Sequence, residues 1–196
     1  LSSEPILMSA LFHDYVVAAR GEKIFSSAST TLSQKILVGT AMTGSGTINA
    51  KSTTSFSSSG TIYINSEIFT YTGITATTFT GVTRAASSTT AAAHAANVVV
   101  SESWTERDTG RSAAAKYKFE RFNFDGSDKF IVVDQDNAPT VFNTSLAATD
   151  VSTSSVAGAK HVAAFKNHMF YSGMSSTPQE VVFSKPFDED DFTSAD

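Results

Sequence analysis

The chain contains no cysteine among its 196 residues, which excludes disulfide bonds and zinc sites built on thiolates. Charged residues make up only 17% of the sequence, while serine, threonine and alanine are abundant, a bias typical of β-rich assembly proteins rather than of enzymes. The formal net charge is −5, so the overall field opposes nonspecific binding to nucleic acid. The longest apolar runs, such as Val98–Val100, fall far short of the roughly 20 residues that a membrane-spanning helix requires. We therefore expect no membrane segment.

The two ends of the sequence lack an initiator methionine, a signal sequence and a closing strand. Leu1 is not an initiator methionine, and the residues after it carry no basic and then apolar signal. Asp196 follows an acidic turn without a closing strand. We expect the sequence to be a piece of a longer polypeptide.

Residues 59–84 contain three short runs with the period-2 alternation of half-buried strands. Ile62 and Ile64 share one face of the first run, and Asn65-Ser66 is short enough to form a tight hairpin turn. In the second run one face carries Glu67, Phe69 and Tyr71. The pattern predicts an antiparallel meander with nothing helical in it.

The same segment has an unusual order of motifs, namely Glu67, Tyr71-Thr72-Gly73, Val82-Thr83-Arg84 and His94. This order resembles a small module that recurs in bacteriophage virion proteins. Ala85 stands where that module usually has a glycine. Because the neighbouring positions are apolar or turn residues, we expect Glu67 and Arg84 to pair across or beside neighbouring strands and to serve the fold.

The rest of the chain has short apolar runs about every ten residues, separated by glycine, asparagine, aspartate and proline turns. The expected strands or hairpins are Tyr15–Phe25, Leu32–Val38, Lys129–Asp134, Thr140–Phe142, Lys160–Phe165, His168–Ser172 and Gln179–Ser184. Several of these units share a plan of strand, polar turn and strand. This favours the blades of a propeller, because one blade cannot bury both of its faces.

A second set of motifs lies in this part of the chain. It comprises Phe122–Gly126, Val132–Asp134, Asn137–Pro139, Lys160–His168 and Val182–Phe192. The set resembles β-propeller-containing phage tail proteins, including the nozzle (tail tubular) proteins of short-tailed phages. The resemblance implies a propeller that is interrupted by inserted small β-modules. Gln135 stands where the pattern usually has a turn glycine.

The predicted fold is therefore all-β, with propeller-like antiparallel blades and a small inserted β-module. The Gly/Ser/Thr-rich stretch Gly39–Ser59 marks the boundary before the module. We expect a first propeller-like part at residues 1–44, the module at 45–100 and a second propeller-like part at 101–196.

Candidate catalytic and metal-binding groups are few. The four histidines, His13, His94, His161 and His168, are isolated from one another in the sequence, and no Gly-x-Ser-x-Gly motif is present. His161 and His168 lack a third zinc ligand at useful spacing. We predict no catalytic, cofactor-binding or metal-binding residues.

Acidic residues leave two alternatives open. They are Asp125, Asp128, Asp134, Asp136 and the run Asp188–Asp191. The Asp134/Asp136 turn resembles part of a calcium loop but lacks its glycine and distal glutamate. A glycosidase pair among Asp125–Asp136 is the second alternative. Aspartates at turns are also explained by their hydrogen bonds to the backbone.

Aromatic residues cluster in the second half of the chain, at Tyr117, Phe119, Phe122, Phe124 and Phe130. They could form a stacking platform for bases or sugars. Phenylalanine has no polar handle, however, so we expect them to pack in a core.

Taken with the resemblance, these patterns predict a structural component of a phage tail in the virion, and no enzyme or cofactor. It would form a homo-oligomeric ring, contact other tail or portal-adaptor proteins, extend the tail, and meet DNA only in transit through the channel. A receptor-binding or fibre-associated tail protein is the first alternative. A tail-associated glycan hydrolase is the second.

Overall fold

The computed structural model describes residues 4–193, and in that range the chain folds as antiparallel β-sheets. Its helical segments there are two single turns of 3₁₀ helix, η1 (Ala86–Ser88) and η2 (Ser154–Val156). Neither turn has the length and apolar character to cross a membrane. The all-β prediction is confirmed.

The chain divides into two compact units. We call them the three-sheet unit (Leu1–His13, Val17–Ser26 and Glu106–Asp196) and the central unit (Asp14–Val16 and Ser27–Thr105). The central unit is almost entirely one stretch of sequence, whereas the three-sheet unit is built from segments on both sides of it.

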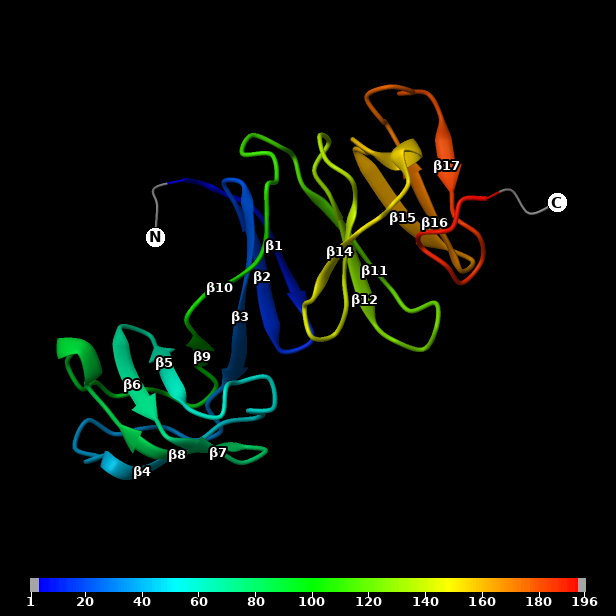
Figure 1. Cartoon of the computed structure of the whole chain (residues 1–196). Helices are drawn as coiled ribbons and strands as arrows, with labels where there is room; N and C mark the ends of the chain where they lie inside the picture. Colours follow the sequence, from blue (N-terminus) through cyan, green and yellow to red (C-terminus); the bar gives the residue numbers. More distant parts are fainter. Residues whose placement is uncertain (1–3, 194–196) are drawn as a thin grey trace. The chain divides into compact units, whose positions relative to one another are not determined.

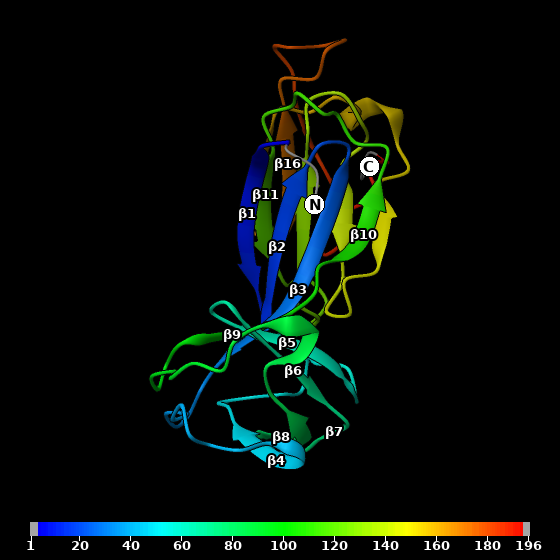
Figure 2. The same cartoon turned by 90° about the vertical axis from the view of Figure 1, so that its left-hand side faces the viewer.

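The three-sheet unit contains three antiparallel sheets (Figure 1). The first is a ten-stranded sheet, to which this unit contributes β1 (Ile6–Phe12), β2 (Tyr15–Arg20), β3 (Lys23–Thr31) and β10 (Thr105–Thr109) in that order (Figure 2), while its other strands lie in the central unit. The second has β11 (Lys118–Phe122), β12 (Lys129–Val133), β13 (Thr140–Phe142) and β14 (Ala148–Asp150). The third has β15 (His161–Phe165), β16 (His168–Ser172) and β17 (Val181–Phe183). In the second and third sheets the strands follow the order of the sequence, as expected for chains that turn back on themselves through short loops.

The two middle strands of the second sheet, β12 and β13, are buried on both faces. On one face the Phe130 ring lies 4.8 Å from the Phe12 ring of β1 and stacks on Phe142 at 4.7 Å. On the other face Ile131 joins a core cluster with Met169 and Tyr171 of the third sheet. This explains why β12 is an unbroken apolar run in the sequence, as predicted for a buried strand.

The central unit is a twisted antiparallel sheet around its own core. Its strands are β4 (Thr43–Asn49), β5 (Gly60–Ile64), β6 (Glu67–Tyr71), β7 (Gly73–Ile74), β8 (Thr78–Thr83) and β9 (Val99–Glu102). The order is β3-β9-β5-β6-β8-β4, with β7 beside β8. After β4 the chain returns to the end of β3 through a bridge between Leu32 and Ala50.

The predicted meander of the central unit is confirmed. Asn65 has φ 53° in the turn between β5 and β6, a conformation that asparagine tolerates better than most residues. Ile62, Ile64 and Phe69 are completely buried, on the faces that the alternation assigned to them. The alternation of apolar and polar side chains along these strands therefore identified the core of this unit from the sequence.

The bounds of the central unit differ from those predicted for the module, residues 45–100. Ala28, Leu32, Ile36 and Met42 belong to the same core cluster as Ile62, so the unit begins well before residue 45. The Gly/Ser/Thr-rich stretch that suggested a boundary contains β4, in which only Ile48 is buried.

The prediction of a strand at Leu32–Val38 is wrong. Only Leu32 and Ile36 form isolated bridges there, and Leu37 and Val38 are exposed. The alternation of apolar residues was present, but no neighbouring strand pairs with this segment along its length. Two bridges are enough to bury two side chains.

Ala85 and Gln135 have φ of 55° and 72°, and each stands where the resembling phage sequences have a glycine. The left-handed conformation costs a residue with a Cβ atom about 1–2 kcal/mol, more than the roughly 0.5–1 kcal/mol that glycine loses in entropy. We expect Ala85→Gly and Gln135→Gly each to raise the free energy of unfolding by about 0.5 kcal/mol, measured by urea denaturation. Ala163→Gly, in the regular strand β15, should instead lower it. Equal losses in all three variants would contradict this account of the two turns.

Candidate functional site

The central unit contains a buried charge cluster formed by Glu67, Arg84 and His94. Glu67 begins β6, Arg84 follows β8 directly, and His94 lies in an isolated bridge with Ile36. Their side chains are 0%, 6% and 1% exposed. Arg84 binds both carboxylate oxygens of Glu67, Nε to Oε1 at 2.8 Å and Nη2 to Oε2 at 2.7 Å. The predicted pairing of Glu67 with Arg84 is confirmed.

Arg84 has no donor left for a ligand. Its Nη1 group donates to the carbonyl oxygens of Leu37 at 2.9 Å and Thr40 at 3.1 Å, and Nη2 also donates to that of Ala92 at 2.7 Å. With the two bonds to Glu67 these contacts engage all five N–H groups of a guanidinium. Arg84 therefore holds two irregular loops, one with Leu37 and Thr40 and the other with Ala92, against the edge of the meander.

The carboxylate of Glu67 is equally engaged. Besides Arg84 it accepts hydrogen bonds from the backbone N–H groups of Ala85 at 3.1 Å and Ala92 at 2.9 Å, and His94 Nε2 lies 2.8 Å from Oε2. His94 Nδ1 faces the Asn65 amide nitrogen at 3.2 Å, and an amide NH₂ can only donate. His94 Nδ1 is therefore the acceptor, and the proton on Nε2 is donated to Glu67.

These contacts set the charge of Glu67. Burial alone would raise the pKa of its carboxyl group, but the hydrogen bonds from Arg84, the Ala92 N–H and His94, with the positive charge of Arg84, lower the pKa to about 2. The group is ionised at neutral pH, with every bond directed into the protein. A cluster of this kind holds a fold together and offers no reactive group.

Removing the charge of Glu67 should therefore destabilise the central unit strongly. Glu67→Gln leaves the Arg84 guanidinium buried without its counter-charge, and we expect a loss of about 3–5 kcal/mol in the free energy of unfolding. Trp104 is the single tryptophan of the chain and lies in the central unit, so its fluorescence during urea denaturation reports this loss. Glu106→Gln is the control, because the exposed pair of Glu106 with Lys23 is worth about 1 kcal/mol or less. Similar losses in the two variants would contradict the structural role of the cluster.

The lowered pKa of Glu67 also predicts a dependence on pH. A carboxyl group whose pKa is lower in the folded state contributes stability above its unfolded pKa, and that contribution disappears as the pH falls through the folded pKa. We expect the wild-type denaturation midpoint, followed through Trp104, to fall steeply as pH drops from about 4.5 to about 2. The Glu67→Gln variant should show a shallower decline. Parallel curves would show that other groups govern the acid sensitivity.

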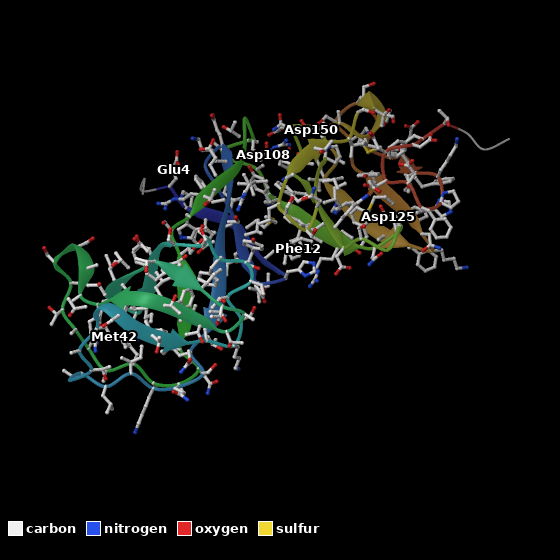
Figure 3. All side chains as sticks on the ribbon, turned by 60° about the horizontal axis from the view of Figure 1, so that its bottom comes forward. Glu4, Phe12, Met42, Asp108, Asp125 and Asp150 are labelled. Atoms are coloured by element: carbon white, nitrogen blue, oxygen red, sulfur yellow. The ribbon has the colours of Figure 1, made fainter. Side chains whose placement is uncertain are left out.

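The three-sheet unit has its own charge cluster around Arg111, a residue that is 7% exposed. Arg111 binds Asp108 at 2.6 Å and Asp150 at 2.7 Å, and it donates to the carbonyl oxygen of Ala138 at 2.9 Å. Asp108 and Asp150, both labelled in Figure 3, come from the first and second sheets. Burial alone would lower the pKa of Arg111, but these two carboxylates raise it. The cluster joins the end of β10 to the hairpin of β13 and β14.

Asp134 lies next to this cluster and is 1% exposed. Its Oδ1 accepts the N–H groups of Asp136 at 3.2 Å and Asn137 at 2.8 Å. Its Oδ2 accepts the Ser112 N–H at 3.3 Å and the Asn137 side-chain amide at 2.7 Å. Four donors thus occupy the carboxylate that the calcium alternative requires, and the turn is an ordinary use of aspartate. Between residues 4 and 193 no group of three or more histidine and acidic side chains is arranged to hold a metal ion.

The other aspartates lie in exposed turns. Asp125 accepts the Ser127 N–H at 3.0 Å and lies 3.3 Å from Lys129 Nζ, and these contacts lower its pKa, the Ser127 bond most. Asp188 accepts the N–H groups of Asp190 and Asp191. The acid of a glycosidase needs a raised pKa, so Asp125 has the opposite environment.

The histidines are not brought together. In the hairpin of β15 and β16, His161 pairs with Ser172 and His168 pairs with Phe165, so the two rings lie at opposite ends of the ladder. His13 is 3.4 Å from Asp128 at the surface, and His94 belongs to the central cluster. The structure therefore does not bring His161 and His168 together as the zinc site considered from the sequence would require.

The aromatic residues that were expected to form a core are partly buried and partly exposed. Tyr117, Phe122 and Phe130 are buried, as expected for a core, whereas Phe119 is 39% exposed.

The sequence did not predict the Arg111 cluster, because Asp150 lies 39 residues from Arg111 and no local motif joins them. It also missed the exposed aromatic residues of the third sheet, which alternate with buried ones as in any half-buried strand.

The chain matches no known protein family, no curated protein and no solved structure.

Proposed function

We propose that this chain is a structural component of a bacteriophage tail, similar to the nozzle proteins that its motifs resemble, and that it works as a ring of copies. One observation carries the proposal. The motif residues of the phage module, Glu67, Arg84 and His94, direct their hydrogen bonds to one another, to Asn65 and to the backbone. Motif residues that bond only within the protein stabilise its fold. A structural component of a virion acts through its folded shape, so this use of the motif residues supports the proposal.

The sheets of the three-sheet unit support the propeller part of the proposal. The second is a four-stranded antiparallel sheet with its strands in sequence order, as in a propeller blade, and the third has three such strands. Within the ten-stranded sheet, β1, β2, β3 and β10 form a similar set of four. The second sheet packs against the first through Phe130 and Phe12 and against the third through Ile131 and Met169. We take these sheets as successive blades.

The central unit fits the role of an inserted module. In the first sheet β3 and β10 are neighbours, yet nearly the whole central unit lies between them in the sequence. An insertion between two paired strands leaves the blade intact, because the entering and leaving segments already lie side by side. The module therefore adds a surface without disturbing the body.

The proposed ring would extend the tail and line its channel, in contact with other tail or portal-adaptor proteins. The net charge of −5 suits a wall along which DNA passes, because a surface of like charge does not hold the phosphate backbone. In this role the protein binds no cofactor and catalyses no reaction.

Gold-labelled antibodies against the chain should mark the tail of the virions that contain it, near the tail axis. Labels at the tips of fibres would contradict the nozzle role and favour receptor binding.

An enzymatic assay separates the structural role from the hydrolase alternative. We expect no turnover of cell-wall or capsular glycans, because Asp134 is fully bonded and the pKa of Asp125 is lowered. The informative variant is Asp125→Asn with Asp136→Asn, since both residues are exposed and the fold should tolerate the change. Turnover that disappears in this variant while its melting temperature is unchanged would establish the hydrolase instead.

A further inference from the structure

We draw no further inference here: the strongest candidate, the exposed apolar face of the third sheet at Phe165, Val181 and Phe183 beside a groove of about 540 Å³, carries none, because nothing in residues 4–193 shows what covers it.

Discussion

A β-sheet is stable in water only when its apolar faces are covered, and this constraint governs the whole three-sheet unit. The second sheet meets it within the chain, because Phe130 packs toward the first sheet and Ile131 toward the third. The outer sheets meet it on one face each. Their other faces carry exposed apolar side chains, Leu11 on the first sheet and Phe183 on the third.

In the central unit the structural requirement is different. Two of its loops have little regular structure of their own and must be held to the sheet by side chains. Arg84 donates to the carbonyl oxygens of Leu37 and Thr40 and of Ala92, while Glu67 supplies the counter-charge. Buried charges are tolerated when each is paired and fully hydrogen-bonded, and between residues 4 and 193 no buried side-chain nitrogen or oxygen lacks a partner. The cluster replaces the strand pairing that these loops do not make.

The sequence identified those parts of the fold in which the side-chain pattern and the hydrogen bonds agree. Ile62 and Ile64 alternate in a strand with partners on both sides, and the Glu67–Arg84 pair follows from two charges in an otherwise apolar module. It missed β4, where glycine and threonine give no alternation and the hydrogen bonds to β8 make the strand. The Arg111 cluster could not be predicted, because only the folded chain brings Asp108 and Asp150 to the same guanidinium.

The central claim is that the chain contributes surfaces to an assembly. A cryo-EM reconstruction of the virion tail tests it most directly. The account predicts repeated copies of the protein around the tail axis, with density for the three sheets in every copy. A map in which the protein occurs as a single copy away from the axis would contradict it.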